Sequence, residues 1–257
     1  MNDDAAPSCT GCHSFGTAAW PLFSNSARGV HRMKKFTFRT ATAKDLGALV
    51  ALERAVETAL PNREMFAIDD EDFYVPIVGG AGHILLAFDQ FQKLAGVSVI
   101  RFPEKDDPEN LGLEVGLSGN DLSRVRHAES IFIRPDCGGM GLASRLLTDN
   151  LAYTDGVGRD FCFATIWPLN APSLKLHLSC GFHIRAFALK YGGKPRFVLM
   201  KSPEPLSFSE NVTYVDAADS ARHMELLGRH AVGTGCRLSS SGRLEIAYRR
   251  LADDTAR

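Results

Sequence analysis

The chain has 257 residues, 45% of them hydrophobic, and its 29 Lys and Arg residues nearly balance its 30 Asp and Glu residues. This composition is ordinary for one soluble domain with an appendage, and because no block of like charge stands out, neither a nucleic acid nor an anionic membrane is an expected partner. The longest apolar runs fall far short of the roughly 20 residues of a membrane-spanning helix, and no signal-peptide pattern opens the chain, so we expect a cytoplasmic protein.

The first 32 residues differ in composition from the rest. Residues 1–32 are rich in Gly, Ser, Ala and Asn without periodicity and are followed by Met33, which predicts a disordered extension. The six cysteines are scattered, which favours reduced thiols over a disulfide framework. Cys9, Cys12 and His13 have the spacing of a haem-attachment motif. A pattern of only five residues is weak evidence for haem attachment. Because such attachment normally accompanies export, a haem protein is a minor alternative.

The first half of the remaining chain reads as strands and short helices. Residues 35–40 alternate like a strand, and Thr42 to Asp45 have capping-box spacing ahead of apolar residues at helical intervals. Residues 69–74, acidic with aromatics, predict a short helix. Two strand-like runs at 83–88 and 95–102 are separated by a polar turn and predict a hairpin. The segment 103–124 is long and polar and contains several glycines, which indicates a surface insertion.

From residue 127 onward, strands and helices alternate. Strands are predicted at 127–133, 160–166, 182–190 and 196–201, and helices at 138–153 and 171–180. The C-terminal segment 205–257 adds a predicted helix near 217–230 and a final strand near 243–249. Alternating strands and helices predict an α/β fold.

Three glycines lie between the strand at 127–133 and the helix that follows it. Gly138, Gly139 and Gly141 leave backbone N–H groups unobstructed at the start of a helix, where the helix dipole favours an anion. A phosphate or pyrophosphate is the natural ligand. A P-loop would need Lys and then Ser or Thr after the last glycine, but Leu142 and Ala143 follow, and the dinucleotide-binding pattern is incomplete.

A longer pattern around these glycines resembles the pyrophosphate loop of the GNAT N-acetyltransferase superfamily. It comprises Ile133-x-Pro135, Gly139-x-Gly141-Leu-Ala and Leu146-Leu147, and a second stretch resembles that family's Asn-helix-Gly-Phe signature, from Asn170 to Phe182. The resemblance covers roughly residues 36–201. It implies a mixed central sheet flanked by helices on both faces, formed by residues 33–203, with residues 204–257 as a C-terminal α/β extension packed on or beside it.

The resemblance also implies a coenzyme A site. The family's Arg or Gln before the glycines falls on Gly138, so backbone amides must carry more of the pyrophosphate binding. Arg145 and Lys175 are candidates for cationic help, and each is equally suited to be a solvated charge on its helix surface. The residues implied to contact the cofactor are Ile131, Phe132, Ile133, Gly138, Gly139, Met140, Gly141, Leu142, Ala143, Ser144, Asn170 and Ser173. Asn170 is equally suited to capping its own helix.

Three residues are candidates for proton transfer. His127 and Glu129 lie two residues apart on one predicted strand, so their side chains project from the same face. We predict that this pair provides the general base that deprotonates an attacking amine. Many relatives place a Tyr on the helix after the Asn, and that position is His177 here, a candidate donor to the leaving thiolate. Cys137 borders the helix N-terminus, but direct transfer needs no thiol nucleophile.

The resemblance implies an acyl-CoA-dependent N-acyltransferase that moves an acetyl group from acetyl-CoA to a primary amine by direct attack in a ternary complex, without a metal. The acceptor would be a small molecule or a peptide, and a homodimer is possible. A catalytically silent acyl-CoA-binding regulatory module is the alternative. It would keep the fold and lack the proton-transfer groups.

Overall fold

A computed structural model describes residues 36–62 and 69–252, all within one compact unit that spans Lys34–Arg257. The predicted extension at residues 1–32 and the Cys9-Cys12-His13 motif lie outside the described residues. The division into 33–203 and 204–257 stays a prediction. Within the described ranges, no helix is long and apolar enough to cross a membrane.

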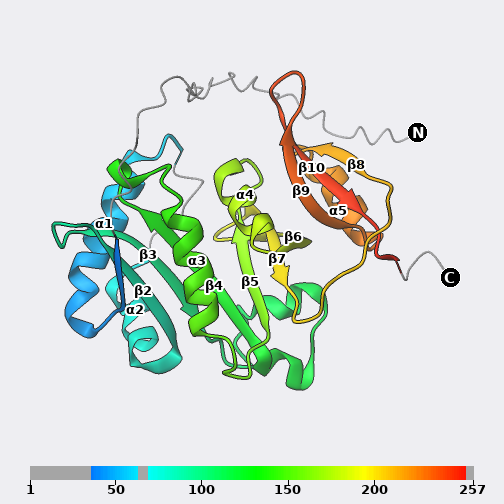
Figure 1. Ribbon diagram of the computed structural model, residues 1–257. Coiled ribbons are helices and arrows are strands. Elements are labelled where there is room, and N and C mark those ends of the chain that lie inside the picture. Colours follow the sequence, from blue (N-terminus) through cyan, green and yellow to red (C-terminus); the bar gives the residue numbers. More distant parts are fainter. Residues whose placement is uncertain (1–35, 63–68, 253–257) are drawn as a thin grey trace, which may run out of the picture. The chain divides into compact units, whose positions relative to one another are not determined.

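The secondary structure follows the predicted order closely (Figure 1). The strands are β1 Thr37–Thr40, β2 Gly82–Phe88, β3 Leu94–Arg101, β4 Val125–Ile133, β5 Phe161–Ile166, β6 His183–Lys190, β7 Lys194–Lys201, β8 Thr213–Asp216, β9 Val232–Leu238 and β10 Leu244–Arg249. The α-helices are α1 Leu46–Ala59, α2 Glu71–Pro76, α3 Leu142–Tyr153, α4 Ala171–Ser179 and α5 Ser220–Gly228.

These strands form one mixed sheet. Its order is β1-β2-β3-β4-β5-β7-β6-β9-β10-β8, and of the neighbouring pairs only β4 and β5 run parallel. The hairpin predicted from residues 83–102 is confirmed as the antiparallel pair β2 and β3. The predicted fold class is confirmed as well: a mixed α/β sheet flanked by helices.

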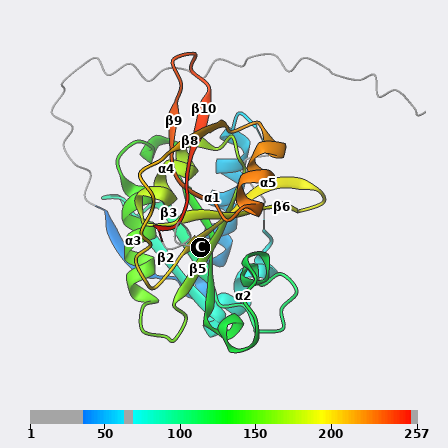
Figure 2. The ribbon, with the colours of Figure 1, turned by 90° about the vertical axis from the view of Figure 1, so that its right-hand side faces the viewer.

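Helices cover both faces of the first half of the sheet (Figure 2). Ile84 and Leu86 of β2 pack in the cluster that contains α1, whereas Leu85 and Ala87 pack in the cluster that contains the start of α3. This alternation is what a strand buried on both faces requires.

Asn150 anchors α3 to the sheet. The side chain is fully buried; its Nδ2 donates to the Ser98 carbonyl at 2.8 Å and to Ser98 Oγ at 3.1 Å, and its Oδ1 lies 2.6 Å from His83 Nδ1. These bonds tie the helix to β2 and β3. They therefore fix the position of the helix start, where the glycines lie.

The segment 103–124 is not the solvated surface insertion that its composition predicts. It contains two 3-10 turns, Leu111–Val115 and Gly119–Arg124, and buries Leu111 against Val125 of β4 and Phe163 of β5. Asn110 holds the first turn by accepting from the Gly112 N–H at 3.0 Å and donating to the Leu122 carbonyl at 3.0 Å. The segment's overall composition is polar, so the few leucines that pack into the core do not stand out in its sequence.

The C-terminal segment adds more strand than its sequence predicts. The predicted helix and final strand correspond to α5 and β10, but β8 and β9 were not predicted. Gly233 and Gly235 weaken the strand signal of β9. At Gly233 an added Cβ would lie 2.7 Å from Ile184 Cβ, so close packing of β9 on β6 requires glycine there.

We expect Asn150→Ala to lower the free energy of unfolding by about 1–3 kcal/mol, because it leaves buried polar groups of Ser98 and His83 without their partner. Urea denaturation followed by circular dichroism measures this loss. Asp149→Ala is the matched control on the same turn; its carboxylate bonds only the exposed Arg145, so a change within about 0.5 kcal/mol is expected. Equal losses in the two variants would contradict the anchoring role.

Candidate functional site

The site is organised by the separation of two neighbouring strands. β4 and β5 pair only from Val125 with Phe161 to His127 with Phe163. Beyond His127, β4 continues to Ile133 paired with β3 alone, and β5 continues to Ile166 paired with β7 alone. The facing edges of the two strands therefore keep backbone groups available for a ligand that inserts between them.

The glycine loop lies beyond the end of β4. Arg145 N–H donates to the Gly141 carbonyl at 3.1 Å and is the first amide of α3 to bond in the helical manner. Among the described residues, no main-chain carbonyl accepts from the N–H groups of residues 141–144. Four amides at the positive end of a twelve-residue helix are the elements of an anion site.

The three glycines serve different needs. Gly139 and Gly141 have φ values of 73° and 74°, in the left-handed region that favours glycine, and an added Cβ would meet no atom within 4 Å at either. Backbone conformation, not space, selects glycine at these two positions. Gly138 has φ −63°, which any residue adopts, and an added Cβ would meet only the Pro135 carbonyl at 3.4 Å. The loop could therefore accept a side chain at 138.

Cations close to the loop in sequence are already engaged. Arg134 binds Asp89 and Asp136, each at 2.6 Å. Arg145 bonds Asp149 at 2.5 Å and lies over the Phe38 ring. Cys137 is fully buried in the cluster beneath α3, which is the setting of a structural thiol.

Glu129 occupies a bulge in β4. The register with β3 shifts between Val99 opposite Ser130 and Ile100 opposite Ala128, so Glu129 has no partner on β3. Its Oε1 accepts from Arg101 Nε at 2.6 Å and lies 3.2 Å from His127 Nδ1. Burial raises the pKa of the Glu129 carboxyl, but the bonds and charges of His127 and Arg101 outweigh it and hold the pKa at about 2. Glu129 is ionised at neutral pH.

His127 is buried and engaged at both nitrogens. Its Nε2 accepts the Leu111 N–H at 3.1 Å, while its Nδ1 lies 3.2 Å from Glu129 Oε1 and 3.1 Å from Arg101 Nη2. Because Arg101 can only donate, Nδ1 either donates to Glu129 or accepts from Arg101, and not both at once. The structure thus brings His127 and Glu129 together as their spacing predicts. Their role in proton transfer stays a prediction.

Three further groups that the sequence analysis missed lie near this pair. Asp69 is partly buried just before α2; burial first, then the charges of Glu53 and Glu129, raise its pKa to about 7. Glu53 is fully buried and accepts the Asp69 N–H at 3.3 Å, and burial raises its pKa also. Tyr74 is fully buried, and its hydroxyl and Glu53 Oε2 have no hydrogen-bond partner among the described residues.

The turn between β6 and β7 completes this side of the site. The Tyr191 hydroxyl lies 3.0 Å from Thr165 Oγ1, on the part of β5 that has separated from β4. Burial first, then the negative charges of Glu129 and Asp69, raise the Tyr191 pKa. Side chains from distant segments thus come near one another: Asp69 and Glu129 act on Tyr191 by their charge, and Tyr191 bonds Thr165.

The second motif forms α4 and its cap. Asn170 Oδ1 accepts the Ser173 N–H at 3.2 Å, so the capping role is present. His177 is buried, donates from Nδ1 to the Ser173 carbonyl at 2.9 Å, and has its pKa lowered by burial. This tautomer leaves Nε2 as an acceptor, so donation to a thiolate would require the ring to be protonated first. The donor role of His177 stays a prediction.

The implied cofactor contacts fall into two groups. Ile131, Phe132 and Ile133 lie on β4 beyond the separation point, with Phe132 buried against α1. The glycine-loop residues 138–141 are exposed. Within the described ranges, no cluster of three His, Cys, Asp or Glu side chains is suited to hold a metal ion.

No family model and no curated protein matches the sequence. Solved structures do match. A GNAT-family acetyltransferase from Streptococcus pneumoniae has TM-score 0.53 and 18% identity over 66% of this chain and 100% of its own. The ribosomal-protein-S18-alanine N-acetyltransferase from Escherichia coli has TM-score 0.50 and 15% identity over 69% of this chain and 98% of its own. A phosphinothricin acetyltransferase from Sinorhizobium meliloti, in complex with acetyl-CoA, has TM-score 0.50 and 18% identity over 65% and 88%.

The chain has the GNAT acetyltransferase fold. The resemblance inferred from two motifs is confirmed at this level. At such low identity the comparison shows the fold alone, and the chemistry must be argued from the residues.

The sequence analysis missed Asp69, Arg101 and Thr165, which lie on separate segments that no spacing rule connects. Tyr191 was open to a place in the wall of the acceptor pocket, but its Tyr-Gly-Gly sequence predicts a turn first. For Asp69 the signal was the acidic stretch with aromatics at 69–74, and a helix of that composition is usually a solvated surface.

We expect Asp69→Asn to change how stability depends on pH. The folded pKa of about 7 exceeds the unfolded value of about 3.9. A raised carboxyl pKa contributes stability below about pH 4 that is lost as pH rises through about 7. Relative to the variant, the wild type should therefore lose unfolding free energy between pH 4 and 7, by about 1 kcal/mol after discounting for partial exposure.

Urea denaturation at several pH values tests this. The exposed Glu71, changed to Gln, is the control and should show no such trend. A wild-type-minus-variant difference that stays constant with pH would show that Asp69 is not perturbed.

Proposed function

We propose that this protein is an acyl-CoA-dependent N-acyltransferase that transfers an acetyl group from acetyl-CoA to a primary amine in a ternary complex. The observation that supports it is the joint placement of the four helix-start amides of residues 141–144, from which no main-chain carbonyl among the described residues accepts, and the separated edges of β4 and β5. The first is suited to a pyrophosphate and the second to an extended amide-bearing arm. Coenzyme A carries both groups in one molecule.

The residues present fit this substrate without a cation in the loop. The amides around Met140 and the N-terminus of α3 would hold the diphosphate. The edge from Ile131 to Ile133 would pair with the pantetheine arm, as strands pair with an added strand. Acetyl-CoA supplies a thioester, and its thiol, with a pKa near 8.5, is a tolerable leaving group.

The acceptor side of the site carries negative charge. Glu129 is ionised there and Asp69 lies within reach of its charge, with Arg101 as the counter-charge, and Arg101 is itself bonded to Glu129 and Asp107. Such a field attracts a cationic ammonium group. We therefore assign the acceptor to primary amines that arrive protonated.

An attacking amine must lose a proton, and Asp69 is the carboxylate best suited to take it. A general base works best with a pKa near the working pH; Asp69 has a pKa of about 7, whereas Glu129 is held at about 2. In this assignment Glu129, oriented by His127 and Arg101, binds the ammonium. Bulge amides of β4 stabilise the oxyanion, a contribution of about 3 kcal/mol per donor in comparable sites.

The same fold would also serve a catalytically silent acyl-CoA-binding module. That alternative requires that no group be available to accept the amine proton. The raised pKa of Asp69 beside Glu129 and Tyr191 favours the enzyme.

Thiol release from acetyl-CoA, measured against a panel of amines, tests the function. Release that depends on the amine is expected, with kcat/KM rising with pH through about 7. Asp69→Asn should remove this rise and lower kcat by about 10²-fold or more. Glu129→Gln should mainly raise KM.

Two results would contradict these assignments. If the rise with pH persists in Asp69→Asn and vanishes in Glu129→Gln, the proton goes to the His127 and Glu129 pair that the sequence predicts. If coenzyme A binds and no amine in a broad panel releases thiol, the silent module is the correct function.

We expect Gly138→Arg to strengthen coenzyme A binding. The backbone at 138 accepts a side chain without strain, and a guanidinium there adds a charge-assisted bond to the diphosphate, equivalent to about tenfold in the dissociation constant. Isothermal titration calorimetry measures this change. Gly138→Ala, which alters the backbone without adding charge, should remain within about threefold of the wild type. Absence of heat in all three proteins would refute the diphosphate site itself.

A further inference from the structure

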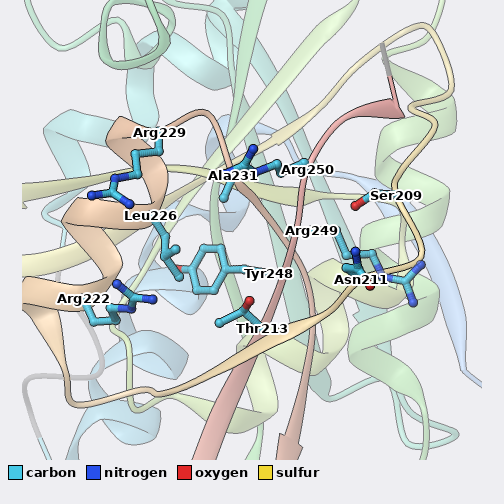
Figure 3. A pocket seen from close by; sticks show the side chains of 10 residues that line it. All are labelled: Ser209, Asn211, Thr213, Arg222, Leu226, Arg229, Ala231, Tyr248, Arg249 and Arg250. Carbon is cyan, nitrogen blue, oxygen red and sulfur yellow. The ribbon is translucent and has the colours of Figure 1, made fainter. Parts of the chain in front are cut away.

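A pocket of about 380 Å³ lies among the C-terminal elements, away from the separated strands (Figure 3). α5, β8, β10 and the segment before β8 line it. Its apolar lining consists of Leu226, Ala231 and Tyr248. The volume is within the range of small-molecule pockets.

Four arginines from two distant segments line this pocket, two on the α5 side and two at the end of β10 (Figure 3). Arg222 and Arg229 come from α5 and its C-terminal cap, whereas Arg249 ends β10 and Arg250 follows it. None of the residues that line the pocket is acidic. In a chain with a net charge of −1, this is a local concentration of positive charge.

The internal counter-charge is smaller than the positive charge. Glu225 bonds both Arg222 at 2.5 Å and Arg229 at 3.2 Å. Arg249 and Arg250 make no ion pair within residues 36–62 and 69–252. Among the described residues, one carboxylate therefore pairs with two of the four arginines, and the other two have no ion pair.

The remaining lining residues are neutral and polar. Ser209, Asn211 and Thr213 contribute hydroxyl and amide groups, and Ser209 N–H donates to the Arg250 carbonyl at 2.9 Å, which holds this segment against the end of β10. Glu210, between two lining residues, is exposed and does not line the pocket.

The apolar side of the pocket is preformed. Tyr248 is buried, and its hydroxyl lies 3.0 Å from His223 Nδ1. The His223 ring packs against Phe197 of β7, with ring centroids 4.8 Å apart. A ligand would therefore meet an ordered wall and would not have to order it on binding.

We propose that this pocket binds a small organic anion that carries two or more negative charges on phosphate or carboxylate groups. Guanidinium groups bind both kinds of oxyanion through paired N–H donors. The neutral polar side chains donate further hydrogen bonds to the ligand's oxyanion oxygens, and the Leu226 side chain packs against its carbon body. This site is additional to the acyl-transfer site and does not depend on it.

Isothermal titration calorimetry at constant ionic strength tests the proposal, with citrate as the carboxylate probe and inorganic pyrophosphate as the phosphate probe. At least one probe should bind the full chain. The double variant Arg249→Gln with Arg250→Gln should weaken that binding at least tenfold. The matched control, Arg237→Gln with Arg243→Gln, removes the same charge from exposed positions of β9 and the β9–β10 turn outside the pocket and should stay within about threefold of the wild type.

A second variant keeps every arginine. Thr213 is exposed at the pocket, and Thr213→Glu places a carboxylate there that should also weaken binding at least tenfold. The two probes separate phosphate from carboxylate preference. Absence of heat with both probes, equal weakening in the two arginine double variants, or pyrophosphate binding that the pocket variants leave unchanged would each overturn the proposal.

Discussion

The end of the β4 and β5 pairing at His127 is the constraint on which the rest of the site depends. If the two strands paired to their ends, their backbone groups would be satisfied and nothing could enter between them. Because they separate, β4 continues alone toward the glycine loop, and the start of α3 lies beyond an open strand edge. The anchoring of α3 through Asn150 keeps the helix terminus in that position.

The separated strands also expose side chains that a closed sheet would bury. The bulge at Glu129 directs its carboxylate into the space beside β5, and Arg101, His127 and the Leu111 amide hold it there. The segment 103–124 therefore does more than connect two strands. It supplies the hydrogen bond to His127 Nε2, and His127 together with Arg101 keeps Glu129 ionised.

The C-terminal elements extend the same sheet and add chemistry of the opposite sign. The space between β4 and β5 gathers carboxylates, whereas the pocket between α5 and β10 gathers guanidinium groups. The negative charge of the first region and the positive charge of the second offset each other in the net charge of the chain, which is −1. Composition therefore gives no indication of either one.

The sequence by itself determined the order of strands and helices through residue 201, the glycine loop and the pairing of His127 with Glu129, because each follows from periodicity or spacing within one short segment. Only the tertiary structure decided that Asp69 and Tyr191 join Glu129, that residues 103–124 are partly buried, and that β8 and β9 exist. These features rest on contacts between segments far apart in the chain. Burial and neighbouring charge, which set the pKa of Asp69 apart from that of Glu129, arise only when those segments meet.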